Sequence, residues 1–218
     1  MLAWAATLAA CLAGPAHAAP ERAASEPAVD AGWILSRIAR PVGSHTPFVE
    51  VRGSKLLKAP LRLSGEYRRP DAATLVREVR SPYAETTTLH AGEALIERAG
   101  QAPRRFSLSR VPELAAVQAS FGALLSGDRA RLERHFHVEG GGARGDWTLD
   151  LVPKDPALAQ ALQRVVLHGR GAELRCIETR PAGKGEVQRT LLAGAATRAT
   201  AAMDAAALAA LCTGDAGA

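Results

Sequence analysis

The sequence contains few aromatic residues and no long apolar run. Aromatic side chains make up 4% of the 218 residues, and 46 alanines account for much of the 47% hydrophobic content. The remaining 57 large apolar residues can fill the core of one domain but not of two. No stretch of about 18 large apolar residues occurs, which excludes a polytopic membrane protein. Charged residues make up only 22% and apolar residues recur periodically, so the chain does not resemble a disordered one.

The sequence also lacks the motifs of common enzyme classes. It contains no G-x-S-x-G, P-loop, G-x-G-x-x-G or H-E-x-x-H pattern. His135 and His137 flank Phe136 on an expected strand and would face the same way, but two ligands are too few for zinc. The tripeptide Arg144-Gly145-Asp146 lies beside glycines and is expected to form a turn. We therefore expect no catalytic residues, no metal and no cofactor.

Three cysteines are present, and none belongs to a C-x-x-C motif, so a redox enzyme or a zinc ribbon is unsupported. Cys11 lies in the N-terminal segment. Cys176 and Cys212 would pair in an oxidising compartment, and two buried free thiols are the alternative.

The N-terminal segment indicates export. Residues 1–18 are apolar and uncharged and end in Ala16-His17-Ala18, a signal-peptidase pattern. In an alternative interpretation, Leu8-Ala9-Ala10-Cys11 is a lipobox and Cys11 carries a lipid anchor. No basic residue precedes the apolar run, which leaves open a start upstream of Met1. Both interpretations place the protein outside the cytoplasm, and the alanine-rich, arginine-rich composition favours a bacterial periplasm. Residues 19–29 are expected to form a flexible leader.

The net charge of +5 does not indicate nucleic-acid binding. The basic residues are scattered and no aromatic residues are interleaved with them. An exported chain also does not meet nucleic acid. Transient contact with anionic lipid headgroups would use this charge better, and a solvated surface is the alternative.

An alternating pattern predicts strands along most of the chain. It is clearest over 57–69, where Leu57, Leu61, Leu63 and Tyr67 share one face. In a later strand Trp147, Leu149 and Leu151 do the same. Turn residues separate the segments. The other expected strands are 46–52, 74–80, 84–90, 93–99, 103–108, 134–139, 146–152, 162–168, 173–179 and 186–193, with a turn at 140–142.

Two helices are expected to cover the apolar face of this sheet. The first spans about 30–40, is capped by Asp30, and has Trp33, Ile34 and Ile38 on one face. The second lies within about 112–132: it begins at Pro112 and ends near Ser126-Gly127, and Asp128 caps a further turn through Leu132. Its apolar face consists of Leu114, Val117, Phe121, Leu124 and Leu125. A helical turn is expected from Pro156, and a short helix within an alanine-rich tail, 196–218.

These elements predict one mainly β domain over 30–195. Ten or eleven antiparallel strands curl instead of staying flat. The expected architecture is an incomplete β-barrel with a helical lid, enclosing a hydrophobic cavity lined by Leu57, Leu61, Leu63, Tyr67, Trp147, Leu149 and Leu151.

Several sequence blocks resemble the LolA family of periplasmic lipoprotein carriers. Leu61-Arg62-Leu63-Ser64-Gly65-Glu66-Tyr67-Arg68-Arg69-Pro70 is followed ten residues later by Ser81-Pro82, then by a strand and Gly92. The segment 147–154 resembles the family's strand before a Pro-Lys turn. A leucine-rich helix followed by Gly127-Asp128 is similar to the divergent LolA-related branch. The resemblance covers about residues 30–193.

The resemblance implies a function as well as a fold. Family members bind acyl chains of lipoproteins and carry them from an inner-membrane exporter to an outer-membrane acceptor. By resemblance, Arg69 corresponds to the arginine that holds the lid to the barrel. Arg69 is also an even number of residues from Leu61, Leu63 and Tyr67 along the strand, so its side chain is expected to point inward with theirs. Backbone carbonyls of the lid would accept its hydrogen bonds there. A solvated arginine at a strand end is the alternative.

The expected function is therefore that of a monomeric carrier of acylated lipoprotein or lipid cargo. Each buried methylene contributes about 0.8 kcal/mol, so an acyl chain gains on the order of 10 kcal/mol before costs. The cargo does not follow from the resemblance, and an aryl-polyene or glycolipid remains open. A lipid sensor with the same fold is a second hypothesis, and a hydrolase of acyl substrates is the third and least favoured.

Overall fold

The computed structural model describes residues 29–52, 60–108, 123–124 and 126–214. Its eleven strands form one antiparallel sheet in the order β6-β5-β4-β3-β2-β1-β11-β10-β9-β8-β7. The strands are β1 (Ser44–Arg52), β2 (Leu61–Arg69), β3 (Thr74–Ser81), β4 (Glu85–His90), β5 (Glu93–Arg98), β6 (Arg104–Ser107), β7 (Phe136–Ala143), β8 (Asp146–Pro153), β9 (Leu162–Arg170), β10 (Glu173–Pro181) and β11 (Gln188–Leu192).

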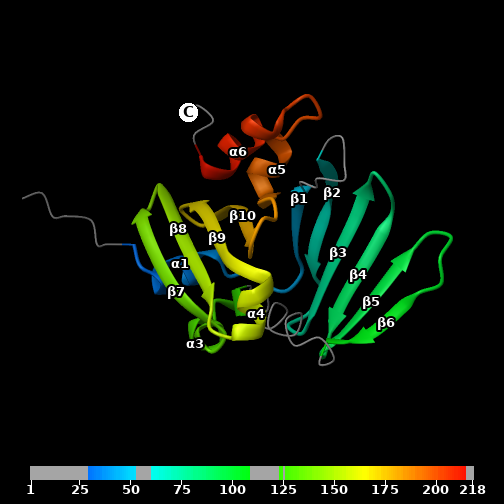
Figure 1. Cartoon of the computed structure of the whole chain (residues 1–218), viewed down its shortest axis with the longest axis horizontal. Helices are drawn as coiled ribbons and strands as arrows, with labels where there is room; N and C mark the ends of the chain where they lie inside the picture. The colour runs from blue at the N-terminus through cyan, green and yellow to red at the C-terminus, as the bar shows by residue number, and fades with distance from the viewer. Residues whose placement is uncertain (1–28, 53–59, 109–122, 125, 215–218) are drawn as a thin grey trace, which may run out of the picture.

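The two halves of the chain meet in the middle of the sheet. β1 pairs with β2 on one side and with β11 on the other, while β6 and β7 lie at opposite ends of the strand order. The sheet is therefore not closed into a barrel. Figure 1 shows it bent into two wings, one with β3–β6 and the other with β7–β9. The predicted fold class, a curled antiparallel sheet that forms an incomplete barrel, is confirmed.

The helices are short, and aspartates begin most of them. They are α1 (Ala31–Ile38), α3 (Arg129–Glu133), α4 (Pro156–Ala161), α5 (Ala193–Arg198) and α6 (Ala205–Thr213). The Asp30 carboxylate accepts a hydrogen bond from the Trp33 backbone N–H at 2.7 Å. Asp128, Asp155 and Asp204 cap α3, α4 and α6 in the same way.

The main core lies on the concave face of the sheet. Residues that oppose each other across strands share a face, so Leu149 of β8, Leu167 of β9 and Ile177 of β10 point the same way. α1 covers this face with Ile34, Leu35 and Ile38, which are at most 3% exposed. The core also includes Phe48, Leu63, Leu132, Phe136, Trp147, Leu151 and Leu192.

The prediction of a turn at 140–142 is wrong, because β7 continues through these glycines to Ala143 and the turn lies at residues 144–145. α1 explains why glycine is needed here. A Cβ on Gly140 would lie 2.4 Å from the Ala31 backbone nitrogen, so the first turn of α1 packs directly on the strand backbone. Gly142 has a positive φ of 94° at the end of β7, one residue before Ala143 and the turn.

The convex face carries a second, smaller core beneath the C-terminal helices. α5 and α6 pack on β1, β10 and β11 through residues that include Val49, Leu191, Leu208 and Leu211. Figure 1 shows both helices at one end of the molecule, outside the curl of the sheet. The predicted domain boundary at residue 195 falls inside α5. The strand predicted over 186–193 is β11, which ends at Leu192, and α5 begins at the next residue, Ala193.

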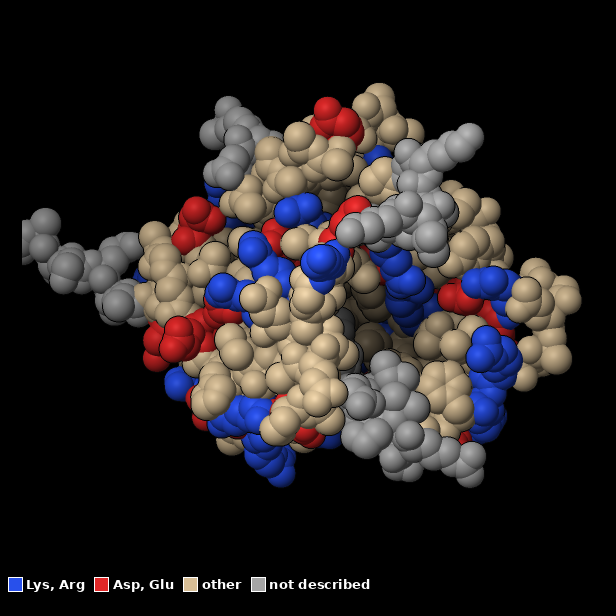
Figure 2. Space-filling model, viewed as in Figure 1, with Lys and Arg blue, Asp and Glu red and all other residues tan. Residues whose placement is uncertain are grey.

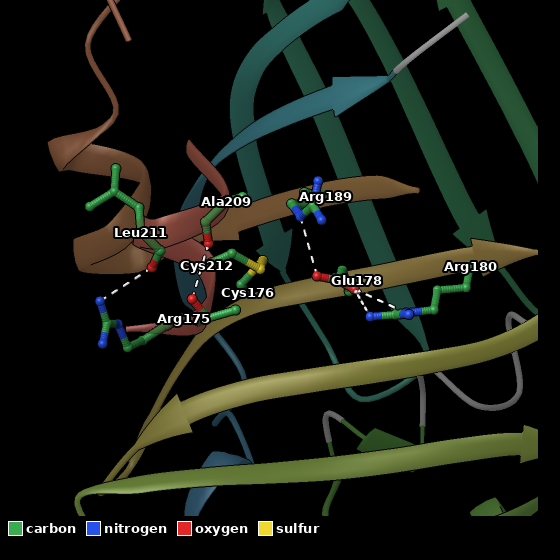
Figure 3. The surroundings of a disulfide bond; sticks show 9 residues. Arg175, Cys176, Glu178, Arg180, Arg189, Ala209, Leu211 and Cys212 are labelled. Atoms are coloured by element: carbon green, nitrogen blue, oxygen red, sulfur yellow. Dashed lines mark hydrogen bonds and ion pairs between the residues drawn. A yellow bond between two sulfur atoms is a disulfide. The ribbon is translucent and has the colours of Figure 1, made fainter. Parts of the chain in front are cut away.

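A disulfide joins the C-terminal helix to the sheet. Cys176 of β10 is bonded to Cys212 of α6, across a sequence separation of 36 residues. Next to it, an Arg175 guanidinium N–H donates to the Leu211 carbonyl at 3.2 Å (Figure 3). This hydrogen bond satisfies one of the backbone carbonyls in the last turn of α6. The covalent bond and the arginine hold the last helix against the convex face.

We expect this disulfide to contribute about 4 kcal/mol to the free energy of unfolding, because it closes a loop of this length in the unfolded chain. The double variant Cys176→Ala/Cys212→Ala should lower the urea midpoint accordingly. Dithiothreitol should lower the wild-type midpoint to the same value and leave the double variant unchanged. A wild-type midpoint that does not respond to the reductant would contradict the expectation.

Candidate functional site

The concave face carries the main apolar core, but α1 covers only one side of this face closely. It contacts β7, β8 and β10, and Ile34 belongs to the same packed core as Trp147, Leu149 and Leu151. These three predicted lining residues are at most 2% exposed. Near its C-terminal end, α1 leaves an uncovered space toward β1–β3.

An apolar pocket of about 60 Å³ occupies that space. Its walls come from the end of α1, from β1, β2, β3, β10 and β11, and from Leu124 in the short helical segment before α3. The lining residues are Ile38, Arg40, Thr46, Tyr67, Leu75, Leu124, Leu174, Ile177 and Leu192. Figure 2 shows the molecule hollowed near its centre, between the two wings.

The predicted cavity-lining residues are divided between pocket and core. Tyr67 borders the pocket, whereas Leu63 is buried in the core and Leu61 packs against it half-buried. Leu57 lies outside the described residues. The sequence did not indicate Leu75, Leu174, Ile177 or Leu192 as lining, because alternation shows which residues share a strand face but not which strands meet across the curl.

The predicted lid residues have similarly mixed positions. Ile34, Ile38 and Leu124 are buried, and Ile38 and Leu124 line the pocket. Trp33 is half-buried, and the guanidinium groups of Arg37 and Arg144 lie 5.7 and 5.8 Å from its ring centre. The remaining predicted lid residues, Leu114, Val117, Phe121 and Leu125, lie outside the described residues. The helix predicted from Pro112 begins outside the described residues. Its predicted end near Gly127 agrees with the structure, where Gly127 has a φ of +70° and Asp128 caps α3.

Arg69 reaches the end of α1. Its guanidinium donates a hydrogen bond to the backbone carbonyl of Arg40, two residues beyond the helix. Its own carbonyl accepts from the Gly43 backbone N–H at 2.7 Å. Arg40 also lines the pocket, so this contact holds the chain at the pocket rim.

A charged cluster on the concave face is the feature that sequence reasoning missed. Glu50 of β1 is 2% exposed and accepts hydrogen bonds from Arg52, from Arg77 at 2.8 Å and from the Gln188 side-chain amide at 2.8 Å. The signal was in the alternation of β1, because Glu50 occupies the same face as Phe48. A carboxylate can stay on this face because three donors surround it.

Tyr67 connects this cluster to the pocket. Its ring lies 4.8 Å from that of Phe48, and the Arg77 guanidinium lies 4.8 Å from the Phe48 ring centre. Burial raises the pKa of the Tyr67 phenol, and the neighbouring Arg77 offsets only part of this effect. The site therefore combines an apolar pocket with a buried polar border.

His135 and His137, considered as metal ligands because they would share a strand face, are not grouped with a third ligand among the described residues. His135 precedes β7, and His137 is exposed on it. Within the described part of the chain, the single grouping of three suitable ligands is His168, Glu178 and Cys212 on the convex face. The Cys212 sulfur is bonded to Cys176, and Glu178 accepts from Arg180 and Arg189 (Figure 3), so these groups are already engaged.

A family model described as outer membrane lipoprotein carrier protein LolA-like matches residues 23–216. The chain belongs to this LolA-like family. Its fold is that of proteins that bind lipids or lipoproteins, and the family consists of extracytoplasmic carriers rather than enzymes. Of the helices in the described residues, none has both the length and the apolar character needed to cross a bilayer.

Solved structures show similarity to the LolA-like chain at low sequence identity. A LolA superfamily protein from Nitrosomonas europaea is 14% identical, with a TM-score of 0.41 and coverage of 76% of this chain and 92% of that one. The MucA/MucB complex of Pseudomonas aeruginosa is 14% identical with a TM-score of 0.38, and the match covers 74% of this chain and 55% of that one. LprF from Mycobacterium bovis is 13% identical with a TM-score of 0.34, and the match covers 78% of this chain and 94% of that one. A search of curated proteins finds no match.

Removing the Arg69 guanidinium should loosen the end of α1 in this LolA-like protein. We expect Arg69→Leu to lower the free energy of unfolding by about 1–3 kcal/mol, because the Arg40 carbonyl loses a charged donor. Urea unfolding measures the difference. Arg68→Leu is the matched control, since Arg68 lies on the other face and its ion pair with Glu78 is partly exposed. Equal losses in the two variants would contradict a specific role for Arg69.

The raised pKa of Tyr67 predicts an alkaline limit to stability. The folded state favours the neutral phenol, so the unfolded chain ionises first, and the stabilisation is lost as the pH rises above about 10. Alkaline titration followed by tyrosinate absorbance should show a late step that Tyr67→Phe abolishes. A titration with the same late step in this variant would show that another group produces it.

Proposed function

We propose that this protein is a periplasmic carrier that binds acyl chains of lipoproteins or related lipids and ferries them from the inner to the outer membrane. The observation that supports this most directly is the apolar pocket between α1, Leu124 and the concave face of the sheet. Membership of the LolA-like carrier family supports the same proposal.

The pocket has to enlarge before it can take a whole chain. A volume of about 60 Å³ holds only a few water molecules. The elements that border it are α1 and the segment around Leu124, and these would move away from β1–β3. In this proposal Arg69 has the lid-anchoring role, because its hydrogen bond to the Arg40 carbonyl joins the end of α1 to the sheet. Opening exchanges that contact for burial of the cargo.

The energetics favour such an exchange. One charged hydrogen bond contributes about 1.5–3 kcal/mol, whereas each methylene removed from water contributes about 0.8 kcal/mol. A chain of ordinary length therefore offsets the loss of the Arg69 contact several times over. Release then requires an acceptor that covers the chain equally well, which is the role proposed for an outer-membrane partner.

The proposed compartment agrees with the cysteine chemistry. The N-terminal segment would be removed as a signal peptide, or would be retained as an anchor through Cys11. A structural disulfide between Cys176 and Cys212 suits an oxidising compartment such as the periplasm. The inner-membrane exporter and the outer-membrane acceptor are inferred as donor and recipient of the cargo.

A charge in the pocket should abolish acyl binding. We expect Leu75→Glu to weaken the binding of a fluorescent fatty-acyl probe by about 10-fold or more, because the carboxylate would be desolvated beside the chain. Val152→Glu is the control, since Val152 is 42% exposed on β8. Thermal unfolding of both variants separates lost binding from lost folding.

Three measurements test different parts of the proposal: binding, transfer and the identity of the cargo. Wild-type protein that binds no acyl probe and is purified from periplasm without lipid would overturn it. Transfer of the bound probe to acceptor vesicles tests the carrier role itself, because a sensor need not release its ligand. Mass spectrometry of lipid bound to the purified protein distinguishes lipoprotein cargo from a free lipid.

A further inference from the structure

The charged cluster around Glu50 has more positive than negative charge. Glu50 supplies one carboxylate, while Arg52 and Arg77 supply two guanidinium groups, and the third partner, Gln188, is neutral. Glu85, a further carboxylate on the same face of the wing, is engaged by Arg98 at 2.6 and 3.1 Å. Among the described residues, one positive charge on this part of the concave face therefore has no matching carboxylate.

The two arginines are held in place by different contacts. Arg77 is 17% exposed, lies over the Phe48 ring and donates to Glu50, so its guanidinium has little freedom. Arg52 is 45% exposed and donates to the other carboxylate oxygen. Glu50 thus orients both groups and leaves several N–H donors directed elsewhere, since each guanidinium has five.

The cluster is continuous with the apolar pocket. Tyr67 lines the pocket, and its ring packs on Phe48, over which the Arg77 guanidinium lies. On β3, Leu75 of the pocket lies two residues from Arg77, a separation of about 7 Å along a strand. Thr46 of the pocket and Glu50 share the same face of β1. In the space-filling view, basic side chains border the central hollow (Figure 2).

We propose that Arg52 and Arg77 bind the phosphate of an anionic lipid headgroup while the acyl chain of the same molecule occupies the pocket. This inference deepens the proposed function and rests on it. A guanidinium presents paired donors that match phosphate oxygens, and its attraction for an anion is stronger where water is partly excluded. The carboxylate of Glu50 keeps the arginines in position when the pocket is empty.

Two probes with the same chain test the headgroup directly. Lauroyl lysophosphatidic acid and monolauroylglycerol share the chain and the glycerol and differ in the phosphate. We expect the wild-type protein to bind the phosphate-bearing probe about 10-fold more tightly or better, as measured by calorimetry below the micellar concentration. Glycerol 3-phosphate distinguishes a lipid site from a site for free phosphate and should bind far more weakly than either lipid.

Variants of Arg52 and Arg77 test whether the preference for the phosphate-bearing probe arises at this cluster. Arg77→Gln and Arg52→Gln should each remove most of the preference for the phosphate-bearing probe over monolauroylglycerol. Arg80→Gln is the control, because Arg80 lies on the same strand as Arg77 but pairs with Glu66 and Glu78 on the opposite face. Arg52 is the more exposed of the two, so Arg52→Gln provides the test if Arg77→Gln does not fold.

The results separate this inference from the function on which it rests. If neither lipid binds the wild-type protein, the proposed function fails. If both lipids bind equally, or if the arginine variants weaken both alike, the carrier function stands and the headgroup site is overturned. Glycerol 3-phosphate binding as tight as that of the lysolipid would also overturn it, since the site would then recognise free phosphate.

Discussion

The central constraint on this molecule is an open sheet whose two faces are both apolar near its middle. Because β1 pairs with β2 and β11, the central strands have neighbours on both sides and their side chains need cover above and below. α1 supplies cover on the concave face, and α5 and α6 supply it on the convex face. The concave cover is incomplete, and the pocket lies where α1 ends.

The two covers are attached in different ways, and the difference fits their roles. On the convex face, a disulfide and the contact from Arg175 to Leu211 tie α6 to β10. On the concave face, the end of α1 is tied to β2 by a hydrogen bond from Arg69 to a backbone carbonyl. A covalent attachment suits a permanent core, whereas a hydrogen bond can be exchanged for the cargo burial that we propose.

Buried charge gives the concave face its polarity. Glu50 would destabilise an apolar surface if it were alone, but Arg52, Arg77 and Gln188 surround it. The cluster and the pocket share Tyr67, so one continuous surface offers both an apolar and a cationic environment. An amphiphile with an acidic head matches such a surface better than a plain hydrocarbon does.

Much of this architecture could be predicted from the chain alone. Alternation located all eleven strands, because a strand with one buried face repeats every two residues whatever its neighbours are. Asp30 marked the start of α1, since a cap is a local interaction. Alternation along β2 also placed Arg69 on the concave face, because it lies two residues after Tyr67.

Only the tertiary structure decided the features that depend on contacts between distant segments. The glycines at 140–142 have the composition of a turn but lie in β7, and the close approach of α1 requires a glycine at position 140. The pocket combines Leu75 with Leu174 and Leu192, which come from strands on both sides of β1 and are brought together by the curl of the sheet. Alternation determines which way a side chain points, while register and curvature determine what it meets, and the second depends on the whole fold.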